Sequence, residues 1–274
     1  MSSPPRPWML LTGGSSGIGR AIAAAWLERG GRLWLTARER SRAERAAREL
    51  ESAHGRQGGS ARGFELENAD PGSRAALAAE VAAGAGAHGP LQAVVLNAGW
   101  IEPHGAFDAG LASAPEAEPL RAHLEADFLG PALLVQALGL ERLSAGPARL
   151  LAIASAAGFR GFPGIAGYVA AKHALLGWVR ALAIDLETQG IAVGALCPYY
   201  VETEMLIRAI QHRSESLGQG LAEARAEFAR RNPGGRLISP AEVAAAALEF
   251  IDRPSSGRVL VLDGGPPREL HSQS

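Results

Sequence analysis

The chain has 274 residues, 47% of them hydrophobic, and a formal net charge of −1, which suits one large α/β domain with a substantial core. Arginines are interspersed with glutamates, as in 38–51, so the sequence does not predict a basic stripe for nucleic acid. The single cysteine, Cys197, excludes an internal disulfide framework, and its apolar strand setting predicts a buried, inert thiol in a reducing, cytoplasmic compartment.

The N-terminal stretch 1–7 is rich in serine and proline and lacks the apolar core of a signal peptide. We predict a disordered leader over 1–7, a single domain over 8–265 and a C-terminal tail over 266–274. No stretch approaches the roughly 20 apolar residues that span a bilayer, so no membrane partner is expected.

Short apolar runs alternate with longer helical patterns along the domain. This alternation predicts a Rossmann-like, doubly wound parallel sheet of about seven strands in a three-layer α/β/α sandwich. The predicted strands are 9–12, 32–36, 63–66, 93–96, 150–154, 192–196 and 259–262. The Ala/Gly-rich stretch 82–89 is interpreted as a connecting loop between a helix and a strand.

A glycine-rich turn follows the first predicted strand and precedes a helical pattern. Its G-x-x-x-G-x-G spacing permits a tight turn and close approach to a pyrophosphate, whose charge would lie at the helix N-terminus. An ordinary glycine-rich strand-to-helix turn is the alternative interpretation. The residues expected to contact a cofactor here are Gly13, Ser15, Ser16, Gly17, Ile18 and Gly19.

The end of the second strand discriminates between nicotinamide cofactors. An acidic residue there would bond the ribose hydroxyls, whereas an arginine would pair with a 2′-phosphate. The chain has Ala37 followed by Arg38, which favours NADP over NAD without excluding NAD. The alternative for Arg38 is an exposed arginine at the start of a helix.

Tyr168 and Lys172 stand four residues apart, and Ser155 lies upstream of both. On a helix this spacing puts the phenol and the ammonium on one face. The lysine charge favours the phenolate, so the tyrosine pKa is expected to move towards neutrality and the phenol to act as a general acid or base. Taken alone, the spacing also occurs on ordinary surface helices.

Together these motifs resemble the short-chain dehydrogenase/reductase family, in its branch of ordinary length. The resemblance rests on TGGSSGIG at 12–19, Asn97-Ala98-Gly99, Ser155, the YxxxK pair and Cys197-Pro198 after a later strand. The motifs occur in the family's order over nearly the whole chain, so the resemblance implies a single Rossmann-like domain.

The resemblance implies further cofactor contacts. Asn97 would steady the central sheet, and Gly99 would let the chain pass close to the cofactor. Ala98, between them, is also expected to contact it. The stretch 67–70 takes the place of the family's short acidic motif near adenine, so Glu67 or Asn68 is expected to contact the adenine ring.

The turn after the sixth predicted strand implies cofactor contacts from Pro198, Val201 and Thr203, with the Thr203 hydroxyl on the carboxamide. Tyr199 replaces the glycine that usually follows the proline. The backbone near the nicotinamide is therefore expected to differ in shape from the family's pattern.

Asp127 is the sharpest departure from the family. Family members usually carry asparagine there, and it holds a water that links the active-site lysine to solvent. A carboxylate can accept a hydrogen bond from such a water, but its charge can also draw Lys172 away from Tyr168. If the carboxylate draws Lys172 away, changing Asp127 to asparagine would raise turnover. If the proton relay has adapted to the carboxylate, the same change would lower turnover, and the intact Ser-Tyr-Lys trio favours this second outcome.

The segment 203–236 interrupts the strand-helix alternation with a mostly helical pattern of apolar positions. In the family this region is a lid over the substrate; a surface helical pair packed on the core is the alternative. Aromatic residues near the expected cleft favour a mainly apolar substrate pocket. They are Trp100, Phe159, Phe162, Tyr199 and Tyr200.

The implied reaction is hydride transfer between a nicotinamide and a ketone or aldehyde, or the reverse from the alcohol. Ser155 would polarise the carbonyl oxygen, Tyr168 would protonate it and Lys172 would bond the nicotinamide ribose. His173 is interpreted as a packing or surface residue. The histidines form no metal-ligand spacing with Cys197, so no metal is expected.

Two other functional classes share these features. A nucleotide-sensing protein with impaired catalysis would tolerate loss of Ser155, Tyr168 or Lys172, all of which are present. Sugar-nucleotide epimerases and dehydratases also use YxxxK but generally carry a larger C-terminal substrate domain. Candidate substrates are β-ketoacyl thioesters, long-chain 3-keto compounds, steroids and simple carbonyls, and the family resemblance implies a homodimer or homotetramer.

Overall fold

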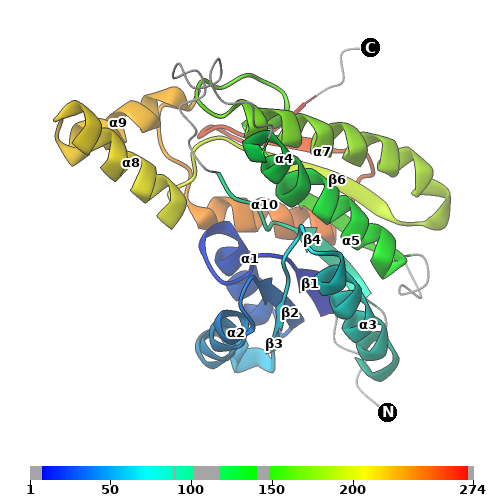
Figure 1. Ribbon diagram of the computed structural model, residues 1–274. Coiled ribbons are helices and arrows are strands. Elements are labelled where there is room, and N and C mark those ends of the chain that lie inside the picture. The colour runs from blue at the N-terminus through cyan, green and yellow to red at the C-terminus, as the bar shows by residue number, and fades with distance from the viewer. Residues whose placement is uncertain (1–7, 89–90, 102–117, 141–147, 271–274) are drawn as a thin grey trace.

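The computed structural model describes residues 8–88, 91–101, 118–140 and 148–270. These residues form an eight-stranded sheet in the order β3-β2-β1-β4-β5-β6-β7-β8, in which only β8 is antiparallel to its neighbour (Figure 1). The strands are β1 (Trp8–Leu11), β2 (Arg32–Ala37), β3 (Ser60–Glu65), β4 (Leu91–Leu96), β5 (Arg149–Ile153), β6 (Ala192–Pro198), β7 (Val259–Leu262) and β8 (Arg268–Glu269).

Helices cover both faces of the sheet, as the strand-helix alternation predicts (Figure 1). α3, α5 and α7 enclose one apolar core against it, and α1, α2 and α10 enclose the other. The helices are α1 (Gly17–Glu28), α2 (Arg40–His54), α3 (Pro71–His88), α4 (Glu118–Leu124), α5 (Gly130–Leu138), α7 (Ala166–Asp185), α8 (Glu204–Leu217), α9 (Leu221–Arg231) and α10 (Pro240–Asp252), with a π turn η2 (Glu125–Leu129) and short 3₁₀ turns η1 (Gly55–Gln57), η3 (Ala156–Gly158) and η4 (Glu187–Gln189).

The order of the strands positions the functional site. The chain runs outward from β1 to β3 on one side, then returns to place β4 on the other side of β1. Crossovers therefore leave in opposite directions at the carboxyl ends of β1 and β4, which opens a crevice between them. β1 and β7 are buried along their whole length and β4 at every residue except Gln92, as expected of a parallel sheet covered on both faces.

The loop predicted over 82–89 is wrong, because α3 continues to His88. Alanine has the highest helix propensity, and Gly84 leaves room for a neighbouring ring, since an added Cβ there would overlap the indole of Trp34. Burying an aromatic side chain gains about 1.5–3 kcal/mol, which exceeds the roughly 1 kcal/mol cost of a helical glycine.

The sheet extends further than predicted at its C-terminal edge. β8 lies within the stretch 266–274 that was interpreted as a tail, and the amide of Leu270 donates to the Val259 carbonyl at 2.8 Å. Arg268 is held by Asp263, with 3.0 Å between Nε and Oδ2. These contacts require neighbouring strands, so local sequence patterns do not reveal them. The predicted leader 1–7 lies outside the described residues.

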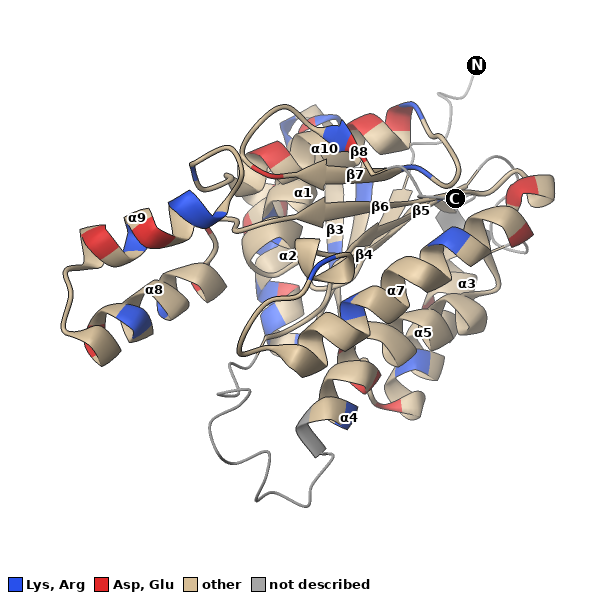
Figure 2. Cartoon of the chain, turned by 90° about the horizontal axis from the view of Figure 1, so that it is seen from above, with Lys and Arg blue, Asp and Glu red and all other residues tan. Residues whose placement is uncertain are grey.

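α8 and α9 form a helical hairpin that projects from the sheet (Figures 1 and 2). The Thr203 hydroxyl caps α8 by accepting from the Leu206 amide at 3.4 Å. Leu206, Ile210 and Phe228 are buried together in a small core of the hairpin's own. The helical pattern predicted over 203–236 is confirmed, while its role as a lid stays a prediction.

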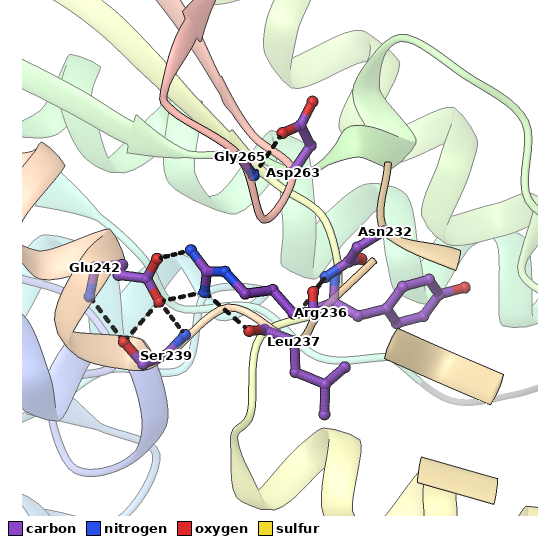
Figure 3. A network of polar contacts seen from close by, with 8 residues as sticks. Asn232, Arg236, Leu237, Ser239, Glu242, Asp263 and Gly265 are labelled. Carbon is purple, nitrogen blue, oxygen red and sulfur yellow. Dashed lines mark hydrogen bonds and ion pairs between the residues drawn. The ribbon is translucent and has the colours of Figure 1, made fainter. Parts of the chain in front are cut away.

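The C-terminal end of the hairpin is held by a polar network (Figure 3). Buried Asn232 accepts from the Tyr200 amide at 2.9 Å and donates to the carbonyls of Tyr200 and Arg236 at 3.0 and 2.6 Å. Arg236 pairs with Glu242, which forms a capping box with Ser239 at the start of α10. The Arg236 side chain lowers the pKa of Glu242 to about 2. These contacts fix the end of the hairpin to the start of α10.

Acidic and basic residues lie side by side on α2 and α9 (Figure 2), so their charges largely compensate. Glu227 of α9, for example, pairs with both Arg213 and Arg231, which lowers its carboxyl pKa to about 2. None of the helices in the described part of the chain is long and apolar enough to cross a bilayer.

Candidate active site

A cleft of about 780 Å³ lies at the carboxyl ends of the strands. This volume is in the range of cofactor and small-molecule sites. Its walls come from the turns after β1, β2, β3 and β4, from α4 and the π turn η2, from the end of β5, from α7, and from the stretch that begins α8. Residues far apart in the sequence therefore meet in a single cavity.

The glycine-rich turn forms the floor of this cleft. Gly13 and Gly17 adopt positive φ angles of 67° and 53°, a conformation that other residues avoid. α1 begins at Gly17, so its free N–H groups and positive dipole end face the cleft, as an anionic pyrophosphate would require. Ser15, Ser16 and Ile18 also line the cavity. Gly19 lies behind it, packed against the Gly13 carbonyl.

Asn97 ties the glycine turn to β4. Its side-chain Nδ2 donates to the carbonyls of Thr12 and Gly13 at 3.1 and 3.0 Å, and its backbone N–H donates to the Thr12 hydroxyl at 2.9 Å. The structure thus places Asn97 where the steadying role implied by the family would put it. Ala98 and Gly99 continue along the cleft wall.

The end of β2 brings two arginines to the cleft. Arg38 and Arg42 line it together with Ala37 and Glu39, and the side chains of Arg38 and Arg42 are exposed. An alanine in place of an acidic residue at this strand end leaves room for a phosphate. Arg42 is a cleft residue that sequence reasoning missed, since the sequence does not show that the first turn of α2 faces the cavity.

Asn68 has two roles in the structure. Asn68 lines the cleft together with its neighbours Glu67 and Ala69, where an adenine contact was predicted. Its buried side chain, however, donates from Nδ2 to the Ala126 carbonyl at 2.9 Å. Asn68 therefore anchors the π turn η2 through one of its backbone carbonyls.

Tyr168 and Lys172 lie side by side on α7, both buried and both lining the cleft. The Lys172 ammonium stands 5.3 Å from the centre of the Tyr168 ring. Ser155 follows β5 and hydrogen-bonds Tyr168, while its Oγ accepts from the Ala157 amide at 3.1 Å. The structure thus assembles the predicted trio from two separate elements.

Burial raises the pKa of the Tyr168 phenol above its ordinary value, Lys172 lowers it, and Asp127 raises it again. The expected shift towards neutrality is therefore wrong, because loss of water around the ring outweighs the neighbouring ammonium. For Lys172, burial lowers the pKa, but the charges of Asp127 and Tyr168 and a hydrogen bond to Asp127 together outweigh burial and leave the lysine pKa raised. Both groups consequently hold their protons through the neutral range.

Asp127 is fully buried in the π turn and contacts Lys172 directly, with 3.4 Å between Oδ1 and Nζ. The same oxygen accepts from the Trp100 amide at 3.3 Å. A Cβ added at Gly99 would lie 2.5 Å from Oδ1 and 3.2 Å from Nζ, so the chain can pass this ion pair only as glycine. The carboxylate thus draws on the lysine, as one of the two sequence interpretations foresaw.

His123 is a residue of this site that sequence reasoning missed. It is buried one helical turn before Asp127, with 3.2 Å between Nδ1 and Oδ2. Its ring stacks on Trp100 at 4.7 Å between centroids and meets the edge of Tyr168 at 6.1 Å. The available signal was the His-x-x-x-Asp spacing, which places both side chains on one helical face.

Only part of the cofactor contacts predicted from the turn after β6 face the cleft. Thr203 lines the cleft, whereas Pro198 and Val201 lie behind its wall. Cys197 is buried, and burial raises the pKa of its thiol to about 12, in keeping with an inert cysteine. His173 is exposed and bonds the Val169 carbonyl of its own helix, which confirms it as a surface residue.

Aromatic residues form a continuous row between the Ser155 turn and α9. Tyr199 meets the edges of Phe159 and Phe162 at 6.2 and 6.3 Å, and Tyr200 in turn contacts Phe162 and Phe228 at 6.2 and 5.3 Å. This row joins four of the aromatic residues predicted near the substrate. Trp100, the fifth, lines the cleft beside His123.

Comparisons with known proteins agree with this geometry. A putative ketoacyl reductase of Streptomyces coelicolor is 34% identical over 237 residues, 86% of each chain. A putative ketoacyl reductase of the granaticin polyketide synthase of Streptomyces violaceoruber is 32% identical, covering 88% of this chain and 84% of that one.

A crystal structure of a variant of actinorhodin polyketide ketoreductase with NADPH superposes with a TM-score of 0.80 at 30% identity, covering 97% of this chain and 98% of that one. The sequence model of the short chain dehydrogenases matches residues 7–214. The chain therefore belongs to the short chain dehydrogenase family.

Proposed function

We propose that this protein is an NADP(H)-dependent reductase of ketones or aldehydes. The observation that carries the proposal is the meeting of Tyr168, Lys172 and the glycine turn in one cleft. A dinucleotide held at the N-terminus of α1 would extend along this cleft, with its reactive end towards the phenol. The structure of the polyketide ketoreductase with NADPH supports the same cofactor here.

The residues present fit such a cofactor. The positive φ angles of Gly13 and Gly17 open the cradle at the start of α1, where a Cβ on Gly13 would approach the Ala98 backbone. Arg38 and Arg42 would hold the 2′-phosphate, and Lys172 would bond the nicotinamide ribose.

The bound dinucleotide supplies the hydride for carbonyl reduction. Ser155 holds and polarises the carbonyl oxygen, and Tyr168 donates its phenolic proton to that oxygen. Because burial raises the pKa of Tyr168, the phenol stays protonated through the neutral range, which is the form that reduction requires. Lys172 then stabilises the phenolate left behind, which makes the proton transfer easier.

We infer a mainly apolar substrate, of the acyl type. The row of Phe159, Phe162, Tyr199 and Tyr200 beside the Ser155 turn supports this class, since aromatic side chains offer large apolar contact areas. Two relatives bear names of ketoacyl reductases, which supports a β-ketoacyl compound.

A nucleotide-binding protein with impaired catalysis is the second candidate. The ion pair between Asp127 and Lys172 favours it, because that carboxylate opposes the effect of the lysine on Tyr168. The presence of the complete trio favours the reductase.

The test is NADPH oxidation, with NADH in parallel, against ketones and aldehydes graded in chain length. We expect turnover with NADPH that improves as the apolar chain lengthens, with β-ketoacyl thioesters among the best substrates. Tight NADPH binding without turnover on any member of the panel would instead support the impaired protein.

We further propose a homodimer or homotetramer, working in the reducing cytoplasm that suits a free thiol such as Cys197. Leu133 of α5 and Ile184 of α7 are 40% and 74% exposed, and both would be covered if these helices paired with a second copy. Light scattering at micromolar concentration should give a multiple of the 28.5 kDa chain mass. A monomer would refute the pairing.

A further inference from the structure

A histidine and a carboxylate stand in line behind the catalytic lysine. The groups are linked in the order Tyr168, Lys172, Asp127 and His123, with 3.4 Å from lysine to carboxylate and 3.2 Å from carboxylate to imidazole. The His123 ring also meets the edge of Tyr168. The exposed fractions of His123 and Asp127 are 1% and 0%. The pair is therefore shielded from solvent and acts on its neighbours with little screening.

Hydrogen-bond chemistry assigns the protons of this pair. An ionised carboxylate can only accept, so the Nδ1 atom of His123 carries the hydrogen that faces Asp127. The Nε2 atom is then the position at which a second proton is gained or lost. Histidine is the side chain whose charge ordinarily changes between about pH 5 and 8.

The charges along this line oppose one another. Asp127 cancels part of the Lys172 charge and so raises the pKa of Tyr168. A proton on His123 would in turn cancel part of the Asp127 charge, leaving the lysine charge free to act on the phenol. The imidazole edge lies near enough to Tyr168, at 6.1 Å between ring centres, for its charge to matter there.

Packing holds the pair in place. Trp100 stacks on the imidazole, its amide bonds Oδ1 of Asp127, and Asn68 ties down the π turn that carries the carboxylate. The described contacts put three residues against His123: Asp127 of the π turn, Tyr168 of α7 and the uncharged Trp100 after β4. Lys172 of α7 contacts the other oxygen of Asp127, and Arg121 and Glu125 of the same helical stretch line the cleft.

We propose that His123 is a positioning residue of the reductase: through Asp127 it sets how strongly Lys172 acts on Tyr168, and it gives carbonyl reduction a histidine-dependent pH step. The inference rests on the proposed reductase function. Below the step the imidazolium offsets the carboxylate, and the phenol gives up its proton more readily. Above the step the neutral imidazole leaves the carboxylate uncompensated.

The pH profile of NADPH-dependent reduction tests this step. In the parent protein, kcat should fall about threefold to tenfold as the pH rises through the step. His123→Gln can still donate a hydrogen bond to Asp127 but never gains a charge. Its kcat should therefore not change with pH and should equal the parent's kcat at alkaline pH. The kcat of Asp127→Asn should not change with pH and should equal the parent's kcat at acidic pH. The sequence favoured a fall in turnover for this variant; the structure reverses that expectation, because the carboxylate pairs directly with Lys172.

His173→Gln is the matched control, since this exposed histidine on α7 bonds only its own helix among the contacts described for it; its profile should retain the step. A step that persists in His123→Gln, or an Asp127→Asn profile at the alkaline level, would overturn the proposal. If His123→Gln does not fold, Asp127→Asn decides the matter alone.

Proton NMR of the substrate-free protein separates this inference from the reductase function. The Nδ1 proton of His123 should give an exchange-protected signal that is absent from His123→Gln, unchanged in His173→Gln and shifted upfield in Asp127→Asn. The upfield shift follows because a bond to a neutral amide is weaker than one to a carboxylate. A signal indifferent to Asp127→Asn would refute the pair, whereas absence of turnover in the parent would refute only the reductase function.

Discussion

Replacing Tyr168 by phenylalanine is expected to lower the rate of carbonyl reduction by about 10²- to 10⁴-fold, the usual contribution of a general acid. Phenylalanine keeps the ring against the Lys172 ammonium and the edge of His123. It removes only the hydroxyl that donates the proton, so binding of NADPH should change little. Steady-state kcat and fluorescence titration with NADPH would measure the two effects separately.

Tyr199→Phe is the matched control for this change. Its hydroxyl accepts from Arg160 at 2.9 Å and belongs to the aromatic row rather than to the cleft lining. We expect it to alter KM for bulky substrates more than kcat. A Tyr168→Phe protein with full activity on a confirmed substrate would contradict the whole mechanism.

Replacing Arg38 by alanine is expected to remove most of the preference for NADP(H) over NAD(H). Charge-assisted hydrogen bonds from a guanidinium to a phosphate contribute roughly 1.5–3 kcal/mol, or about one to two orders of magnitude in Kd. The loss should fall on NADPH alone, because NADH has no 2′-phosphate. Dissociation constants for both cofactors, measured in the parent and the variant, check the prediction.

Arg40→Ala is the control within the same segment. Its guanidinium is exposed and pairs with Glu44 one turn along α2, and it does not line the cleft. Both cofactors should bind this variant as they bind the parent. Arg42→Ala should weaken NADPH binding as well, since Arg42 faces the same cavity. Equal affinity of the parent for NADPH and NADH would sink the assignment of Arg38.

Much of the fold followed from local signals in the sequence. The alternation of apolar strands with helical patterns predicted the sheet and its two covered faces, and the strand at 259–262 was predicted with the bounds the structure gives. The helix over 82–88 was misjudged because its glycine is explained only by the ring of Trp34, which packs against it from β2. β8 was missed because a two-residue strand has no periodicity of its own.

The sequence by itself determined the glycine turn, the Tyr168–Lys172 face and the arginine at the end of β2, because each depends on residues that are neighbours along one element. Only the tertiary structure decided that Asp127 touches Lys172, that His123 stands behind it, and that the pKa of Tyr168 rises. Those outcomes depend on burial and on distances between α7 and the π turn before α5. Such distances are fixed by how helices pack on a common sheet, which no spacing along the chain records.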